Sequence, residues 1–213
     1  MLRKVLLSAL LVVTPLAQAE WFVSPKISAE YMDYSTDWLE DSFIAPAAGV
    51  SIYNTSGWFM DVEVLSGSGD TVDRDETTAT IGKSLGAGYS LFAGLKDTTT
   101  TGTDVDGDYW DFNATGFFAG LNKSVRLGSG NSLAFSAAVA SLSGDVALTL
   151  ASDNFNSSVQ EGDALGLSLG GAWNANIGDA MTSSIGAKYQ SYDYDNLDVE
   201  SIVSVYGKLS YRF

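Results

Sequence analysis

The sequence predicts an all-β protein, an antiparallel up-and-down transmembrane β-barrel of about ten strands. Three observations lead to this fold class. Apolar and polar residues alternate with a period of two in segment after segment. Short and long connections follow each other in turn along the chain, and aromatic residues gather in two bands that bracket an aliphatic belt.

The first 19 residues read as a secretory signal peptide. Arg3 and Lys4 form a positive start, residues 5–13 are almost wholly apolar, and Ala17-Gln18-Ala19 is a small-residue cleavage motif. The apolar stretch is shorter than the roughly 20 residues that a membrane anchor needs. We therefore expect Sec-type export, cleavage after Ala19 and a single domain over residues 20–213.

Composition excludes several classes of function. The chain has 213 residues, 26 acidic against 11 basic, a formal charge of −15, and neither histidine nor cysteine. Disulfides, thiol chemistry and histidine-activated nucleophiles are therefore absent. Nucleic acid is a poor partner, because binding it requires basic residues that neutralise phosphates. We expect no catalytic residues, no cofactor and no metal centre.

Ten segments carry the strand pattern in order along the chain. The alternation is less regular in the second and fourth, so eight strands remain an alternative count. The expected strands cover residues 23–31, 43–53, 60–64, 76–85, 89–96, 110–119, 132–139, 165–174, 181–190 and 203–213.

The connections between these strands differ in length. Glycine and asparagine supply tight turns at residues 54–57, 85–88, 128–131 and 174–179. Long polar loops are expected at about 35–42, 66–76, 97–108, 144–162 and 193–200. Both ends of the barrel domain then lie on the short-turn side, which is the layout of outer-membrane barrels with short periplasmic turns.

The aromatic bands favour a membrane barrel over a soluble β-sandwich or lipocalin-like barrel. The face opposite the aliphatic one is small and polar and carries charges, so it would make a poor soluble core. We expect nine aromatic side chains to face outward in two girdles: Trp58, Tyr89, Trp173, Tyr211 and Phe213 near the short turns, and Tyr31, Trp110, Phe112 and Tyr189 near the long loops.

The chain resembles the small Gram-negative outer-membrane barrels of the OmpA/OmpX type. The resemblance rests on the signal peptide, the short-turn and long-loop rhythm, and the ending Leu209-Ser210-Tyr211-Arg212-Phe213. It implies residence in the outer membrane, contact with lipid bilayer and lipopolysaccharide, and recognition of Phe213 by the barrel-assembly machinery. That type has eight strands, whereas this chain shows ten.

Charged residues on the expected luminal face leave two functions open. Opposite charges could pair and plug the barrel, giving a non-enzymatic structural or surface-interaction protein with acidic extracellular loops. Lysines could instead line a narrow porin-like diffusion channel that favours anions. The residues assigned to the lumen are Lys26, Glu30, Asp61, Glu63, Lys96, Asp111, Lys123, Lys188, Lys208 and Arg212.

Bulky and small side chains on that face point in opposite directions. Phe92, Phe117, Tyr192 and Tyr206 are expected to obstruct the lumen, while small residues along 132–140 and 164–174 would leave space. Asp61 and Glu63 are also the nearest candidates for a carboxylate pair that activates water, against the plainer expectation that they pair with luminal lysines.

One acidic loop has a weak cation-binding pattern. Asp104, Asp106, Asp108 and Asp111 offer several carboxylate oxygens, which a hard cation such as Ca²⁺ prefers. A calcium loop of the EF-hand type needs Gly at its sixth position and Glu at its twelfth, but this chain has Tyr109 and Thr115 there. Divalent cations bridging to lipopolysaccharide are a milder expectation.

Overall fold

The computed structural model describes residues 20–36, 39–103, 107–128, 130–150, 155–156, 160–195 and 199–213. Within these ranges the protein is all-β, and no helix is long and apolar enough to cross a membrane. The strands are β1 Trp21–Ser35, β2 Glu40–Asn54, β3 Trp58–Ser68, β4 Val72–Gly86, β5 Tyr89–Thr103, β6 Tyr109–Gly128, β7 Asn131–Leu150, β8 Phe155–Asn156, β9 Gln160–Ile177, β10 Met181–Tyr194 and β11 Val199–Tyr211.

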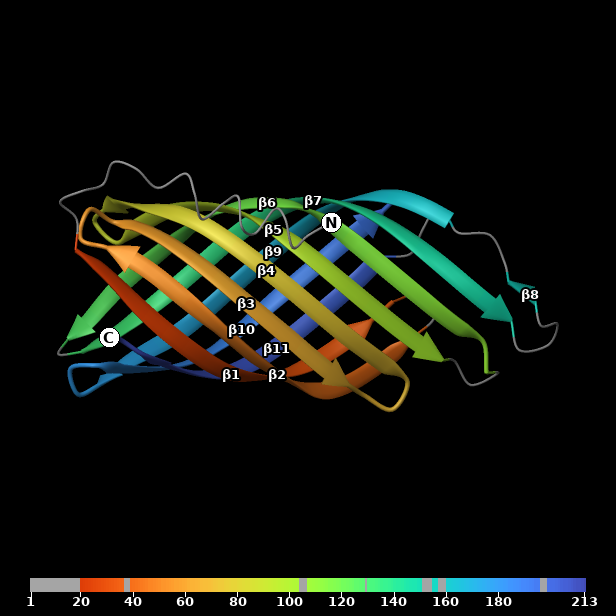
Figure 1. Ribbon diagram of the computed structural model, residues 1–213, viewed down its shortest axis with the longest axis horizontal. Helices are drawn as coiled ribbons and strands as arrows, with labels where there is room; N and C mark the ends of the chain where they lie inside the picture. Colours follow the sequence, from red (N-terminus) through yellow and green to blue (C-terminus); the bar gives the residue numbers. More distant parts are fainter. Residues whose placement is uncertain are drawn as a thin grey trace.

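Ten of the described strands close into a barrel (Figure 1). Each pairs antiparallel with its neighbours in sequence order, β7 pairs with β9, and β11 pairs back onto β1. The two-residue β8 only extends the far end of β7. The ten-strand prediction is therefore confirmed, and the irregular segments 43–53 and 76–85 lie in the strands β2 and β4.

The strands are strongly staggered around the ring. A path of paired residues that leaves β1 at Phe22 and passes once around the barrel returns to β1 at Tyr34, 12 residues further along (34 − 22). Such a stagger tilts the strands to the barrel axis, by roughly 35–45° in closed barrels. Closure with this tilt gives every strand of the ring a paired neighbour on each side.

The two ends of the barrel differ as the sequence predicts. Tight turns join the strands at one end, here called the short-turn end, where Gly57 has φ 89° and its N–H donates to the carbonyl of Asn54. At the opposite, long-loop end, β6 and β7 reach 20 residues each and β9 reaches 18. Much of the expected loops 66–76, 97–108 and 144–162 is therefore strand, which is a correction to the sequence prediction.

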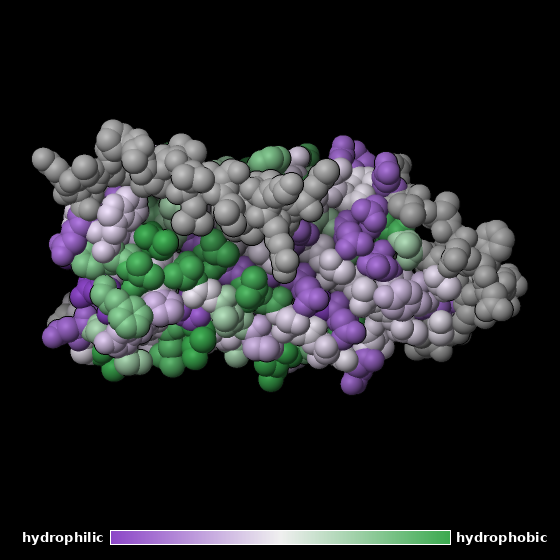
Figure 2. Space-filling model, in the orientation of Figure 1, coloured by the Kyte–Doolittle hydropathy of each residue, from purple (hydrophilic) through white to green (hydrophobic). Residues whose placement is uncertain are grey.

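The outer wall changes character along the barrel. On the face seen in Figure 2, hydrophobic side chains gather in the left half, toward the short-turn end, and hydrophilic ones dominate the right half. Large apolar side chains exposed in the belt include Val23, Ile27, Ile81, Leu91, Leu121, Val139, Leu169, Ile185, Val205 and Leu209.

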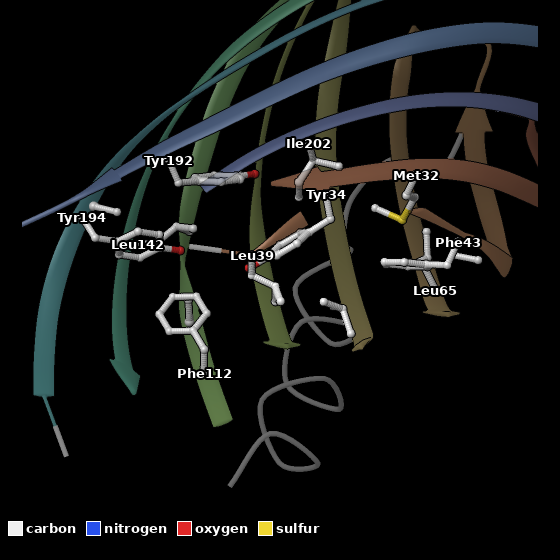
Figure 3. Close-up of a cluster of buried hydrophobic side chains, with 14 of the residues drawn as sticks. Met32, Tyr34, Leu39, Phe43, Leu65, Phe112, Leu142, Tyr192, Tyr194 and Ile202 are labelled. Atoms are coloured by element: carbon white, nitrogen blue, oxygen red, sulfur yellow. The ribbon is translucent and has the colours of Figure 1, made fainter. Parts of the chain in front are cut away.

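The interior shows the reverse pattern. Near the short-turn end it is polar, but in the half toward the long loops, here called the outer half, it holds the apolar core of the molecule (Figure 3). This core includes Met32, Tyr34, Phe43, Leu65, Val72, Phe112, Leu142, Tyr192, Tyr194 and Ile202. Each strand keeps the same inward face along its length, but that face is polar near the short turns and apolar in the outer half. The loop prediction failed because the alternation of polarity inverts where the strands leave the apolar belt.

Candidate functional site: a charged lumen closed by an apolar plug

An ion-pair cluster fills the lumen on the short-turn side. The ammonium of Lys26 lies 2.6 Å from a carboxylate oxygen of Asp61 and 2.6 Å from one of Glu63. Lys208 lies 3.2 Å from Glu63, and the hydroxyl of Ser51 donates to Asp61. The register places these residues on β1, β2, β3 and β11, which are neighbours in the ring, so alternate inward positions bring the opposite charges together.

A second cluster lies deeper, toward the outer half. Arg74 is 1% exposed, and its guanidinium lies 2.5 Å from Glu200 and 3.5 Å from Glu76. Lys96 lies 2.8 Å from Glu76 and donates to the hydroxyl of Tyr192. These contacts connect β4, β5, β10 and β11 across the interior. Lys188 and Glu30, 3.3 Å apart, form another pair across the lumen.

The apolar core packs around this cluster in the outer half. Phe112 packs edge-on against Tyr194 with ring centroids 4.9 Å apart (Figure 3). The guanidinium of Arg74 lies over the ring of Tyr34. Burial raises the pKa of Tyr34 and of Tyr194, and the negative charge of Glu200 raises both further. Both phenols therefore stay neutral and add no charge to the plug.

Among the described residues, two small cavities lie beside the ion pairs. One of about 170 Å³ touches Lys96, Lys188 and Glu76, and the other of about 220 Å³ touches Lys208 and Tyr206. Small residues of β7 and β9 line both cavities: Ser136 touches both, Ser168 the first and Gly170 the second. The predicted space along 132–140 and 164–174 is therefore real, but it is divided into pockets of a size that holds a few waters.

Most of the charged residues assigned to the lumen lie inside the barrel. Lys26, Glu30, Asp61, Glu63, Lys96, Lys188 and Lys208 take part in the clusters above. Arg212 sits exposed at the short-turn mouth, where its guanidinium covers the ring of Phe22 and donates to the carbonyl of Asp179.

Lys123 was assigned to the lumen wrongly. Its ammonium lies on the outer wall at the short-turn end, 3.7 Å from the ring centroid of Tyr89, and donates to the carbonyl of Ala87. Lys83 makes the same arrangement with Trp58 and the carbonyl of Ser56. A long lysine beside an aromatic ring at the edge of an apolar belt covers apolar surface with its stem and keeps its charge in the polar zone.

The alternation of β6 is opposite to the one predicted. Trp110 is 3% exposed and Phe112 also faces inward, so neither belongs to an outer girdle. Asp111 lies on the outward face, where it accepts from the side chain of Asn113, and Phe117 is outward at 70% exposure. The prediction followed the polar and apolar residues of the outer half, where the interior is the apolar side. The other seven predicted girdle residues are exposed: Tyr31, Trp58, Tyr89, Trp173, Tyr189, Tyr211 and Phe213.

The sequence reasoning missed the central charges of the plug. Arg74 and Glu200 were placed in the outer loops, and Glu76 was given no role. The signal was present, because Val72, Arg74 and Glu76 continue the inward parity of β4. Charges there look solvent-exposed unless the strand is extended into the expected loop.

The acidic loop shows no cation geometry in the described part of the chain. Asp104 and Asp106 lie outside the described residues, and Asp108 and Asp111 flank the start of β6. Within the described ranges, no group of three or more acidic side chains is placed to hold a metal ion.

Comparison with known proteins identifies the fold. No family model matches the chain, and no curated protein matches its sequence. The outer membrane protease OmpT from Escherichia coli is similar in structure with a TM-score of 0.56 and 9% identity, over 95% of this chain and 99% of that chain. Neisserial surface protein A (NspA) has a TM-score of 0.50 and 9% identity, over 92% and 99%. The resemblance to small outer-membrane barrels is thus confirmed at the level of the fold.

Proposed function

We propose that this protein is an integral outer-membrane barrel with a closed lumen and a non-enzymatic role in structure or surface interaction. One observation carries the proposal. Among the described residues, the interior holds five bases and five acids in mutual contact: Lys26, Arg74, Lys96, Lys188 and Lys208 with Glu30, Asp61, Glu63, Glu76 and Glu200. A balanced interior attracts neither anions nor cations, whereas a selective pore needs an excess of one sign.

The outer surface supports the membrane location. A continuous belt of exposed aliphatic side chains would be costly in water, and exposed aromatic residues lie toward both of its edges. The outward carboxylates of the outer half, such as Asp73, Asp75 and Asp163, then face the extracellular side. Bilayer lipid and lipopolysaccharide are the partners that this surface would meet.

The export and assembly signals belong to the same proposal. Residues 1–19, with cleavage after Ala19, lie outside the described residues. The ring of Phe213 is exposed and packs edge-on against Tyr211, while its N–H donates to the carbonyl of Val23 on β1. An exposed terminal aromatic next to the closing strand is accessible to an assembly factor.

The chemistry of the lumen supports a non-enzymatic role. OmpT is named as a protease, but this chain has no histidine to act as a general base. The ammonium of Lys26 holds the carboxylate pair Asp61 and Glu63, so one oxygen of each carboxylate is already paired. Breaking these contacts to activate water would leave a buried charge without its partner.

Conductance in a planar bilayer tests the closed lumen. The refolded protein should migrate faster on a detergent gel before boiling than after, and once inserted should show no discrete conductance steps in a salt gradient. Anion-selective steps that lose selectivity in a Lys96→Met/Lys188→Met variant would establish the lysine-lined channel instead.

A further inference from the structure

One junction of the barrel wall is incomplete. β2 and β3 pair only from Ala47 opposite Leu65 to Tyr53 opposite Phe59, seven residue pairs, whereas β1 and β2 form 15. β2 continues on its other side to Glu40, and β3 continues on its other side to Ser68. The segments 40–46 and 66–68 are both described in the structure, and they do not pair with each other. The main-chain ladder between β2 and β3 therefore ends before the two strands do, toward the long-loop end.

Two residues bound this unpaired stretch of β2 and β3. Pro46 is the first residue of β2 beyond the ladder; it has no N–H, and proline within sheets is confined to edges and bulges. At the far end, the carboxylate of Asp41 accepts from the N–H of Thr71 at 2.8 Å and of Val72 at 2.9 Å. The side chain of Asp41 thus joins β2 to the β3–β4 turn where main-chain pairing has stopped.

A pocket of about 410 Å³ lies in the wall where the β2–β3 ladder ends, and we call it the seam pocket. This volume falls in the range of small-molecule sites. Pro46, Ala48 and Val64 give it an apolar side that continues the exposed belt. Ser66, Asp75 and Thr77 give it a polar side toward the outer half.

The two strands pack closely on the inner side of this unpaired stretch. A Cβ added to Gly67 would lie 2.6 Å from the Cβ of Ala45 and 2.8 Å from the ring of Phe43, so the two strands nearly touch inside the barrel. Leu65, Phe43 and Ala45 are all buried in the apolar core. The seam pocket opens to the outside of the barrel and is backed by Ala47, Leu65 and Glu76, which occupy inward positions of their strands.

We propose that the seam pocket binds one acyl chain of an amphiphile that enters the outer leaflet from outside and whose headgroup bears hydroxyls and no negative charge. The apolar side lies in the belt that, under the proposed function on which this inference rests, faces lipid. Tyr31 and Ile44, paired across β1 and β2 and both exposed, mark the edge of that belt just above Pro46. The chain would lie along Pro46, Ala48 and Val64. The headgroup would meet the hydroxyls of Ser66 and Thr77, and the carboxylate of Asp75 would repel an anion.

Photolabelling of the refolded full barrel domain in phosphatidylcholine vesicles tests this site. The probe is a dodecyl maltoside with a diazirine near the end of its chain, and peptide mass spectrometry maps the labelled residues. We expect saturable labelling concentrated on β2 and β3 near residues 44–48 and 64–66. The same chain on a sulfate headgroup should label these residues less, because of Asp75.

Two matched variants make the test specific. Ala48→Trp fills the seam pocket, whereas Ala187→Trp places the same ring on the outward belt of β10, at a fully paired junction. The first should lower seam labelling about tenfold, which corresponds to ~1.4 kcal/mol of binding free energy, and the second should not. Even labelling around the whole belt, or no effect of Ala48→Trp, would overturn the site while leaving the membrane barrel intact. A protein that takes no label anywhere on its belt would overturn the proposed membrane location as well.

Discussion

Arg74 holds the charged core of the plug together. It is fully buried, bonded to Glu200, Glu76 and the hydroxyl of Thr100, and covered by Tyr34. Removing one partner of a buried pair leaves the other charge uncompensated, which costs roughly 3–5 kcal/mol. We expect Arg74→Met to lower the free energy of unfolding by about that amount, measured by urea titration of the folded barrel.

A double variant provides the control for Arg74. Arg74→Met/Glu200→Gln removes both charges and should recover much of the lost stability, because a neutral pair of similar size carries no uncompensated charge. If the single variant were as stable as the parent, the cluster would not hold the outer half together.

The contact between Asp41 and the β3–β4 turn depends on pH. Partial burial alone would raise its pKa, but the N–H groups of Thr71, Val72 and Ser42 and the hydroxyl of Thr71 outweigh burial and hold the pKa of Asp41 below its ordinary value. A lowered folded-state pKa means that the contact is complete above the unfolded value of about 3.9 and is lost as the pH falls through the lower folded value.

Hydrogen exchange at Thr71 and Val72 reads this contact. Normalised protection of the two amides should be constant above about pH 4 and fall in stronger acid. Asp41→Asn should lower it roughly 2- to 10-fold at neutral pH. Asp33→Asn, which removes a nearby carboxylate that accepts from the hydroxyl of Ser42, should leave both amides unchanged; equal effects of the two variants would contradict the role of Asp41.

At the scale of the element, the inverted alternation of β6 predicts which neighbours are accessible. Asp111 faces outward and Phe112 faces the buried core. Because the chain has no cysteine, single substitutions give a clean readout with a membrane-impermeant maleimide. Asp111→Cys should react in whole cells at least about tenfold faster than Phe112→Cys, as expected for exposed against protected positions. Equal rates would mean that the strand is not folded with this parity.

The strands could be predicted from sequence better than their faces. Period-two alternation located all ten long strands, including the irregular β2 and β4, because each strand buries one side whatever the surroundings. Alternation cannot say which side is inward, and the answer depends on whether lipid or water lies outside. For β1 and β11 the C-terminal pattern and the girdles settled this, but Trp110 and Phe112 in β6 lie where the rule reverses.

The candidate site was only partly within reach of the sequence. The luminal lysines and the acids of β1 and β3 followed from parity, since these strands alternate without interruption. Their pairing partners Arg74, Glu76 and Glu200 did not, because they lie in segments that looked like loops. The early end of the β2–β3 ladder could not be predicted either. Pro46 can be read from the sequence, but the register that places it just beyond the ladder is set by the whole ring.

At the scale of the whole molecule, closure depends on the last strand. β11 pairs with β1 from Lys26 opposite Ser210 to Ser35 opposite Ser201, and with β10 on its other side. Removing residues 199–213 would expose unpaired backbone on β1 and β10, which is not tolerated in lipid. We expect the truncated chain to lose the fast-migrating form on an unheated gel and to aggregate, whereas removal of Phe213 alone should keep that form once the chain is refolded in detergent.

The pairing of β1 with β11 also sets when the barrel can close. Lys26 and Ser210 become neighbours only after nearly the entire polypeptide has been synthesised, so the ring cannot close before the last strand is available. Contacts between such distant residues carry a large closure entropy and form slowly. Under the proposed membrane location, the chain therefore reaches the membrane before its ring is closed. It must be shielded from aggregation until its two ends pair.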